Sequence, residues 1–310
     1  MSLPALLISF LTFVELNCEN LFDYRHDSLK ADTEFLPEAP RHWTRFRYWK
    51  KVNNIAQEIM SCTSNGIPDL VALCEVENDS VMTDLTRRSL LRYAGYEYIM
   101  TDSPDARGID VALLYSPYAF SPVSTQCFRI VAPDGMRPTR DILYVSGEII
   151  TGDTIHVFVV HSPSRYDGKM ATQPYRLKVA GRLCAAIDSL RALSPYAQII
   201  VAGDFNDYAT DEPLVQIGSR DLHNVTLDAT GGNGIKANYR YKGKWGSIDH
   251  VFLSSSMLSS FDSAHINDAL FLLEDDEQYG GKKPRRTFNG YKYQDGYSDH
   301  LPLVVRFRFR

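Results

Sequence analysis

Short apolar runs, rich in β-branched and aromatic residues, recur along the chain between polar segments that contain Gly and Pro. Such runs are typical of strands. The run at 154–160 is apolar at successive positions, so both faces of that strand should be covered. The pattern predicts strands at residues 11–18, 70–74, 111–115, 142–149, 154–160, 198–202, 248–253 and 303–309.

Three longer segments show the spacing of amphipathic helices. Residues 172–193 are the clearest, because Leu177, Ala180 and Leu183 fall on one stripe. Residues 47–61 and 80–91 are predicted to be helices as well. The polar stretch at 274–297 is predicted to be a long loop, and such loops are often functional.

The order of these elements predicts an architecture. Strands outnumber helices and do not alternate strictly with them, which favours an α/β (α+β) protein with two packed sheets and helices outside. No repeat, low-complexity tract or linker interrupts the 310 residues. We therefore expect a single domain over residues 1–310.

Composition and charge narrow the functional classes. The net charge is −5, from 33 Lys and Arg against 38 Asp and Glu. This balance argues against a protein that coats nucleic acid through bulk charge, although it allows a local basic groove. The five cysteines are odd in number and include no Cys-x-x-Cys pair, so we expect buried thiols rather than a disulfide framework or a zinc site.

The N-terminal apolar run, residues 3–14, is too short to span a bilayer as a helix. No Lys or Arg precedes it, so it resembles a signal peptide poorly. We expect part of it to be a buried strand and expect no transmembrane anchor. Both a cytoplasmic protein and one exported after loss of a leader remain open.

Polar residues stand at the ends of the predicted strands. Strand ends converge on one rim in a layered α/β protein, so scattered carboxylates and imidazoles can meet there. Glu75, Glu19 and Asp299 could give a hard cation such as Mg²⁺ its oxygen ligands. Imidazoles could move protons near neutral pH. The strand-end residues are Asn17, Glu19, Glu75, His161, Asp204, Asn206, Asp249, Asp299 and His300.

These segments resemble, in order, those of the endonuclease/exonuclease/phosphatase superfamily, which includes deoxyribonucleases, sphingomyelinases and inositol-polyphosphate phosphatases. The resemblance extends from Asn17 to His300. It implies a four-layer αββα sandwich and hydrolysis of phosphate esters with Mg²⁺ or Mn²⁺. The segments are LNCENLFD at 16–23, LCEVEN at 73–78, RGIDVALLY at 107–115, HSPSR at 161–165, GDFND at 203–207, SIDH at 247–250 and SDH at 298–300.

The resemblance implies roles for the residues that hold the metal and the phosphate. Glu75 matches the principal metal-binding glutamate, and Glu19 would lie beside the metal. Asn17 would help anchor the site and would bind the phosphate, stabilising its phosphorane-like charge together with Asn206 and His161. Asn206 matches an asparagine that contacts the phosphate, and His161 matches a histidine that touches the scissile phosphate and acts as general acid in the deoxyribonuclease branch.

The resemblance also implies roles in handling the attacking water. Asp204 matches the aspartate that orients or activates the water, and His300 matches the general base or transition-state stabiliser. Asp249 matches the acidic partner of His300. Asp299 matches a carboxylate that lies behind the ligands or faces the metal. Which of Asp204 and His300 takes the proton is left open.

Further polar residues are candidates on chemical grounds alone. Arg165 and Arg107 could grip a phosphate. Asp110 is a weaker candidate partner for His161, and His250 is expected to be structural. The basic–aromatic stretch at 41–51 is either a substrate platform or a helix entry. The stretch at 239–245 is expected to face substrate, whereas the basic run at 282–286 is expected to be a solvated loop.

We predict in-line attack of water on a phosphodiester by a nuclease-like enzyme, with DNA or RNA as possible substrates. A phosphomonoesterase on a lipid or sugar phosphate is the second reading. The third is a catalytically inactive binding module of the same fold. No stable protein partner is predicted. Other di-metal phosphatases favour histidine-rich sites, and the chain has only 8 scattered histidines.

Overall fold

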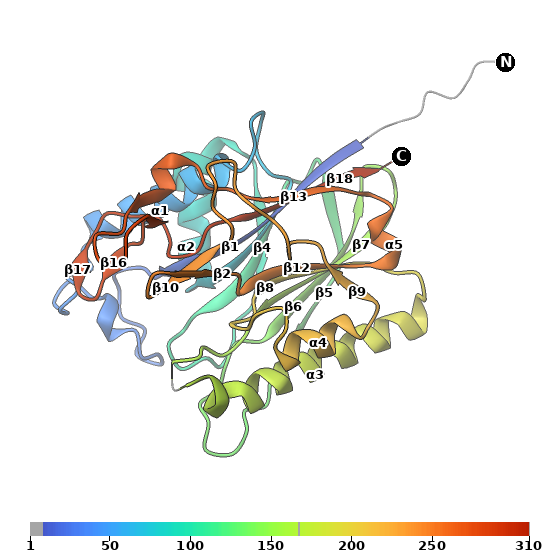
Figure 1. Cartoon of the computed structure of the whole chain (residues 1–310), viewed down its shortest axis with the longest axis horizontal. Coiled ribbons are helices and arrows are strands. Elements are labelled where there is room, and N and C mark those ends of the chain that lie inside the picture. Colours follow the sequence, from blue (N-terminus) through green and yellow to red (C-terminus); the bar gives the residue numbers. More distant parts are fainter. Residues whose placement is uncertain (1–8, 167, 310) are drawn as a thin grey trace.

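The computed structural model describes residues 9–166 and 168–309 and consists of two six-stranded mixed sheets packed face to face (Figure 1). Residues 3–8 of the N-terminal apolar run lie outside the described residues. The first sheet has the order β13-β18-β1-β2-β4-β3. Its strands are β1 (Ser9–Leu21), β2 (Leu70–Val76), β3 (Glu97–Met100), β4 (Asp110–Tyr115), β13 (Phe261–Ile266) and β18 (Leu303–Phe309).

The second sheet has the order β5-β6-β7-β8-β12-β9. Within the two sheets, β1 and β2 are parallel, as are β7 and β8, and the other pairs are antiparallel. The strands are β5 (Phe120–Phe128), β6 (Ile142–Ile149), β7 (Thr154–His161), β8 (Gln198–Asp204), β9 (Leu222–Asn224) and β12 (Asp249–Ser254).

Helices cover the outer faces of both sheets (Figure 1). Helices α1 and α2 lie against the first sheet, and α3 and α4 lie against the second. The sandwich therefore has the four layers that were predicted. The helices are α1 (Arg45–Met60), α2 (Asp79–Thr83), α3 (Lys169–Leu193), α4 (Glu212–Gly218) and α5 (Ser255–Leu258), and short 3₁₀ segments occur at Thr33–Phe35, Leu90–Tyr93 and Leu270–Leu272.

Alternating side chains of the central strands supply the separate cores. In β7, Val157 and Val159 point into the core between the sheets, and Phe158 and Val160 point into the core beneath α3. Successive strand residues point to opposite faces, so a strand covered on both sides is apolar throughout. The prediction for this strand is confirmed. The result is a rigid pair of sheets whose strand ends can hold polar groups.

The other predicted strands are also present, but three local predictions were wrong. Residues 80–91 do not form one α-helix, because α2 passes into a π-helical turn (Asp84–Arg88) and then a 3₁₀ segment. The predicted loop at 274–297 contains two hairpins instead. Cys127 is exposed, whereas the other four cysteines are buried. The hairpin strands are β14 (Leu273–Asp275), β15 (Lys282–Pro284), β16 (Phe288–Asn289) and β17 (Lys292–Tyr293).

A third hairpin, β10 (Tyr239–Tyr241) and β11 (Lys244–Gly246), stands beside the sheets. Helix α1 begins two residues before its predicted start and is N-capped by the Thr44 side chain. Among the described residues, no helix is both long and apolar enough to cross a membrane.

Helix α1 carries a buried acid whose protonation is linked to folding. Neither side-chain oxygen of Glu58 has a hydrogen-bond partner among residues 9–166 and 168–309. Burial raises the pKa of Glu58 from its usual 4.5 to about 8. The neutral acid is therefore the form that the folded chain favours. The protonated Glu58 carboxyl therefore contributes to the free energy of unfolding in full below pH 4.5, and this contribution is lost as the pH rises through about 8.

We predict that Glu58→Gln stabilises the protein at pH 8.5 and not at pH 5. The amide has the shape of the neutral acid but cannot ionise, so the penalty at high pH disappears. Thermal unfolding should show Tm higher by roughly 2 °C or more at pH 8.5. Equal Tm differences at both pH values would contradict an ionisation effect. Glu148→Gln, at an exposed acid, is the control.

Candidate active site

The ends of the central strands meet at one edge of the packed sheets and line a pocket. Asp204 is the last residue of β8, and it lies beside His161 of β7 and opposite Asp249 of β12. The pocket has a volume of about 160 Å³. It is lined by Asn20, Glu75, Arg107, Arg140, His161, Ser164, Asp204, Asn206, Tyr239, Ile248, Asp299 and His300.

Asp204 is held in a fixed orientation by amide groups. Its carboxylate accepts hydrogen bonds from the Asn17 side chain at 3.0 Å, the Asn206 backbone N–H at 2.8 Å and the Asn206 side chain at 3.2 Å. Asn206 takes a φ of +52°, which turns the loop back over the strand end. Burial, followed by the charge of Asp249, raises the pKa of Asp204 to about 7.

Gly203 allows β8 to approach β7 closely just before Asp204. It lies opposite Val160 and has a φ of +145°, where side chains are rarely tolerated. A Cβ at this position would overlap the carbonyl oxygen of Val160. The same strand pairing places the Nε2 atom of His161 3.6 Å from the Asp204 carboxylate. Gly203 is thus a structural requirement of the site.

His161 is buried with its Nε2 atom between two carboxylates. This nitrogen lies 3.6 Å from Asp204 and 3.7 Å from Glu75. Burial, with a further contribution from the positive charge of Arg140, lowers the pKa of His161 well below its usual value. The Nδ1 atom has no partner within the described part of the chain. Asp110 does not orient this ring.

Asp110 is engaged elsewhere, so the weaker suggestion that it orients His161 was wrong. It accepts hydrogen bonds from Thr101 and Ser103. His250 is buried and packs on Phe205, and its two ring nitrogens contact the Asn224 side chain and the Asp207 carbonyl, each at 3.0 Å. These contacts agree with the structural role that was predicted for His250.

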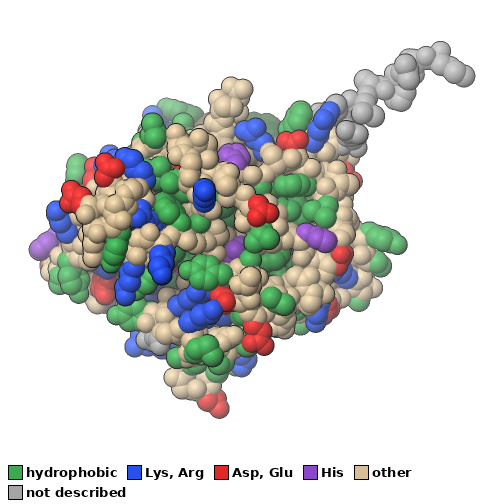
Figure 2. All heavy atoms as spheres, in the orientation of Figure 1, with side chains coloured by type: hydrophobic (Ala, Val, Ile, Leu, Met, Phe, Trp, Pro, Cys, Tyr) green, Lys and Arg blue, Asp and Glu red, His purple; other side chains and the backbone are tan. Residues whose placement is uncertain are grey.

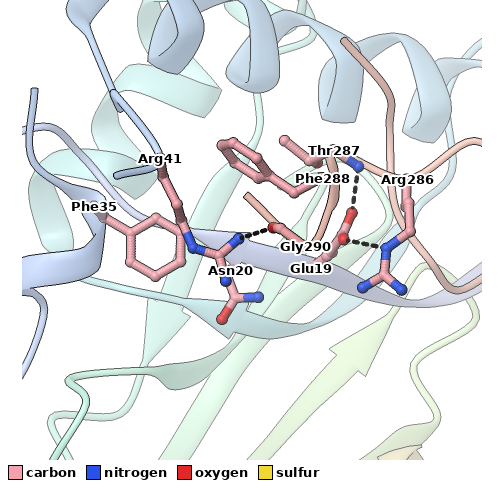
Figure 3. A pocket seen from close by; sticks show the side chains of 8 residues that line it. All are labelled: Glu19, Asn20, Phe35, Arg41, Arg286, Thr287, Phe288 and Gly290. Atoms are coloured by element: carbon pink, nitrogen blue, oxygen red, sulfur yellow. Dashed lines mark hydrogen bonds and ion pairs between the residues drawn. The ribbon is translucent and has the colours of Figure 1, made fainter. Parts of the chain in front are cut away.

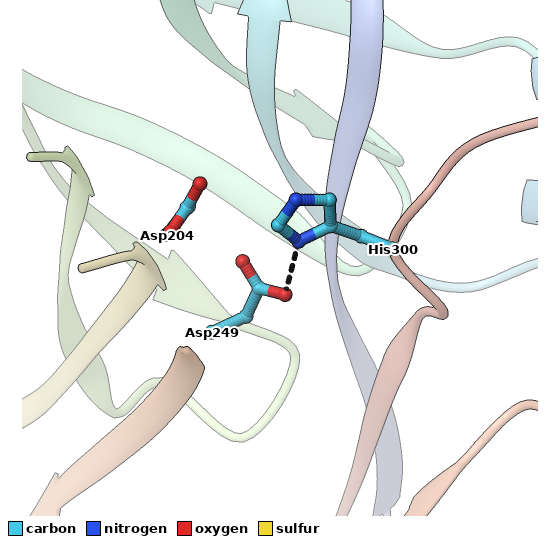
Figure 4. A group of neighbouring side chains, drawn as sticks. All are labelled: Asp204, Asp249 and His300. Carbon is cyan, nitrogen blue, oxygen red and sulfur yellow. Dashed lines mark hydrogen bonds and ion pairs between the residues drawn. The ribbon is translucent and has the colours of Figure 1, made fainter. Parts of the chain in front are cut away.

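His300 and Asp249 form a hydrogen-bonded pair next to Asp204 (Figure 4). The Nδ1 atom of His300 lies 2.7 Å from Oδ2 of Asp249, which also accepts a hydrogen bond from Asn238. The Tyr239 ring packs 4.7 Å from the imidazole, centre to centre. Burial alone would lower the pKa of His300, but the charge and hydrogen bond of Asp249, together with the charges of Asp299 and Asp204, outweigh it and raise the pKa well above its usual value.

Glu75 reaches the pocket from a distorted part of β2. The strand has a bulge between Cys74 and Val76, and Glu75 has a φ of +62°. Bulges of this kind often aim a side chain at a functional site. One carboxylate oxygen accepts the Asn20 backbone N–H at 2.8 Å, and the other lies 3.7 Å from His161. Glu75 is therefore fixed yet open to the pocket.

The structure separates the two other acids expected near a metal. Asp299 lines the pocket and accepts a hydrogen bond from Arg286 at 3.0 Å. Glu19 does not line it. Its two oxygens accept from Arg286 at 3.1 Å and from the Thr287 backbone N–H at 2.6 Å. Glu19 is thus drawn towards the segment before β16 and not towards Glu75.

The arginines differ in what they contact. Arg107 lines the pocket and donates to the Asn20 side chain. Arg165 does not line it, because its guanidinium bonds to the Asn206 carbonyl, to Asp207 at 3.1 Å and to Asp211 at 2.7 Å. It braces the loop after β8 from outside.

Two places could hold a divalent cation. Donor atoms of Asp204, Asp249 and His300 all lie within 4.8 Å of one another (Figure 4). However, Asp249 does not line the pocket, and its bonded oxygen is shared between His300 and Asn238. Glu75 lines the pocket together with Asn20, Asp204 and Asp299, whose side chains carry oxygen atoms, the donor type that Mg²⁺ prefers. We therefore favour Glu75 as the principal ligand.

Some residues in the pocket or bonded to its acids were not predicted from the sequence. Arg140 is buried, lines the pocket and donates to the Ser162 carbonyl at 2.9 Å, although nothing in its local sequence indicates this. Asn238, which donates a hydrogen bond to Asp249, also belongs to none of the sequence motifs. Arg286 belongs to the run expected to be a solvated loop, and that expectation was wrong for this residue. Tyr239 lies in the stretch that was expected to face substrate.

This chain is similar to one known protein family and to several solved structures of the same fold. A model described as Endonuclease/Exonuclease/phosphatase family matches residues 12–308. Among solved structures, an endonuclease/exonuclease/phosphatase family protein from Bacteroides thetaiotaomicron has a TM-score of 0.66 and 18% identity, covering 98% of this chain and 96% of its own. No curated protein matches the sequence.

Two further solved structures share the fold. The mannosyl-6-phosphatase Bt3783 of Bacteroides thetaiotaomicron has a TM-score of 0.63 and 18% identity, covering 96% of this chain and 100% of its own. The human nocturnin catalytic domain with bound sulfate has a TM-score of 0.59 and 17% identity, covering 98% of each chain. At these identities the similarity establishes the fold alone.

We predict that Gly203→Ala destabilises the protein by roughly 3 kcal/mol or more, because overpacking and a disfavoured φ act together. Denaturant unfolding measures the change. Gly218→Ala is the matched control, since a Cβ there meets nothing within 4 Å and the residue ends α4. Equal stability of the two variants would show that β7 and β8 do not require the glycine.

Proposed function

The chain belongs to the endonuclease/exonuclease/phosphatase family, and we propose that it is a divalent-metal-dependent hydrolase that cleaves phosphodiesters by in-line attack of water. One observation carries the proposal. The amide-held carboxylate of Asp204, the neutral imidazole of His161 and the Asp249–His300 pair converge on one pocket with two arginines. Such a pocket combines anion binding with groups that move protons.

The residues of this chain divide the work as follows. Arg107 and Arg140 bind the phosphoryl oxygens, and the Asn206 amide binds them by exchanging its hydrogen bond to the Ser162 carbonyl. Asp204 and His300 orient the attacking water and manage its proton between them. Asp249 holds the imidazole of His300 with its Nε2 atom directed away from the pair, because the Nδ1 atom is occupied at 2.7 Å. His161, which is neutral because burial lowers its pKa, contacts the phosphate through a ring N–H.

Glu75 would hold Mg²⁺ or Mn²⁺, with Asp299 and Asn20 beside it. The cation would offset charge on the phosphoryl group and on the departing oxygen. Glu19 is not part of this proposal, because its oxygens are engaged by Arg286 and Thr287. Arg165 acts through the loop that carries Asn206.

The diester assignment rests on the segment from His161 to Ser164, which resembles the deoxyribonuclease branch. A specific observation favours phosphomonoester hydrolysis as the second candidate. The pocket offers two arginines, Arg107 and Arg140, which could pair with the two negative charges of a terminal phosphoryl group. The fold is also shared with a mannosyl-6-phosphatase. A sugar phosphate or a lipid headgroup phosphate is the substrate class for that candidate.

We predict that Asp204→Asn and Glu75→Ala each lower kcat/KM for bis-p-nitrophenyl phosphate with Mg²⁺ by roughly a hundredfold or more. The first loses the group that orients water, and the second loses the principal metal ligand. p-Nitrophenyl phosphate, assayed in parallel, separates diester from monoester preference. Glu148→Gln removes an exposed carboxylate and serves as the control.

Full activity in either site variant, with folding verified by circular dichroism, would remove that residue from the proposed machinery. A higher kcat/KM for the monoester than for the diester would replace the first candidate by the second. Activity unchanged by a chelator would contradict metal dependence itself.

A further inference from the structure

A second pocket lies beside the candidate active site, and Figure 3 shows the side chains that line it. Its volume is about 180 Å³. Asn20 lines both pockets, and Arg286 links them because it bonds to Glu19 on one side and to Asp299 on the other. The second pocket is lined by Glu19, Asn20, Phe35, Arg41, Arg286, Thr287, Phe288 and Gly290.

Arg41 is fixed in place before any ligand arrives. Its guanidinium lies 5.4 Å from the Phe35 ring, 4.9 Å from the Phe288 ring and 5.8 Å from the Tyr291 ring. It also bonds to Glu34 at 3.2 Å and to the Gly290 carbonyl at 3.4 Å. Stacking on rings restrains a guanidinium without using up its donors.

Arg41 and Arg286 each retain an unused nitrogen. Arg41 bonds through Nε and Nη1, and Arg286 bonds through Nε and Nη2. The remaining Nη2 of Arg41 and Nη1 of Arg286 bond to no group in residues 9–166 and 168–309. Figure 3 shows the two side chains flanking Asn20 from opposite ends of the pocket.

Two arginines and one acidic residue line the second pocket. Glu19 is its only acidic lining residue among those described, and both of its oxygens are occupied. The Nζ atom of buried Lys51 also lies 4.0 Å from Oε2 of Glu19. On the surface, Lys and Arg gather on the side that carries β10, β16 and β17, with acidic side chains interspersed (Figure 2). Each guanidinium is ion-paired, Arg41 with Glu34 and Arg286 with Glu19 and Asp299, so the pocket offers a phosphate their unbonded nitrogens rather than an uncompensated charge.

We propose that this pocket binds a second phosphate of the substrate, next to the phosphate that is cleaved. The inference rests on the proposed function and narrows its substrate class. Guanidinium groups bind phosphate through charge-assisted hydrogen bonds in a fixed geometry. Two sources supply neighbouring phosphates: the backbone of an oligonucleotide and a bisphosphorylated sugar. Arg41 is the specificity residue, since Arg286 also contacts Asp299 of the active site.

The test compares matched substrates with and without the second phosphate. The nucleotide arm uses the p-nitrophenyl ester of thymidine 5′-phosphate, with or without a 3′-phosphate. The sugar arm uses fructose 1,6-bisphosphate and fructose 6-phosphate. In the wild type, one arm should show higher kcat/KM for the doubly phosphorylated member. Arg41→Ala should reduce that preference roughly tenfold, through KM, whereas Arg41→Lys should retain part of it.

Arg45→Ala is the matched control, because this exposed arginine belongs to the same basic stretch and lines neither pocket. It should leave the preference intact. The arm that shows the preference identifies the source of the phosphate. A wild-type preference below twofold in both arms, or one that survives in Arg41→Ala, would overturn the subsite.

Binding separates this inference from the proposed function. If the wild type cleaves none of these esters, the proposed function fails. Calorimetry with thymidine 3′,5′-bisphosphate and thymidine 5′-phosphate, and with the two fructose phosphates, still decides the subsite. Tighter binding of the doubly phosphorylated member in either arm, weakened about tenfold by Arg41→Ala, supports it. Equal affinities of wild type and variant refute it.

Discussion

Several carboxylates lie buried within a few ångströms of one another where the two sheets meet, and the rest of the site is organised around this repulsion. Asp204 and Asp249 face each other across paired strand ends, and Glu75 shares the His161 imidazole with Asp204. Like charges in a dry site are costly unless hydrogen bonds and cations offset them. Some of the residues that supply this compensation, His300 and Asn206 among them, are also proposed to act on the substrate.

The compensation is divided between two neighbouring sets of partners. Around Asp204 and Asp249 it comes from amides and from His300. Around Glu19 and Asp299 it comes from Arg286, which joins the active site to the second pocket. Glu19 and Glu75 look equivalent in the sequence because both follow strands. Their different partners give them different roles in the structure. Glu75 keeps a side facing the pocket, whereas Glu19 does not.

The fold and much of the site could be predicted from the sequence, because strand periodicity and strand-end position are local properties. Strand-end position was therefore enough to predict four residues that line the pocket: His161, Asp204, Asn206 and His300. The departures arise from long-range contacts. Glu19 finds its partner in Arg286, 267 residues away, through a segment whose hairpins were read as a loop. Arg165 bonds to Asp207 and Asp211 in the segment after β8, and no local sequence pattern predicts this pairing.

The most direct test of the account is the position of the cation. Anomalous diffraction from crystals soaked with Mn²⁺ would locate it without reference to activity. The account predicts a peak against the Glu75 carboxylate, on the pocket side, with the Asp249–His300 hydrogen bond intact. A peak between Asp204, Asp249 and His300, with none at Glu75, would contradict it, because those groups would then be ligands and could not manage the proton of the attacking water.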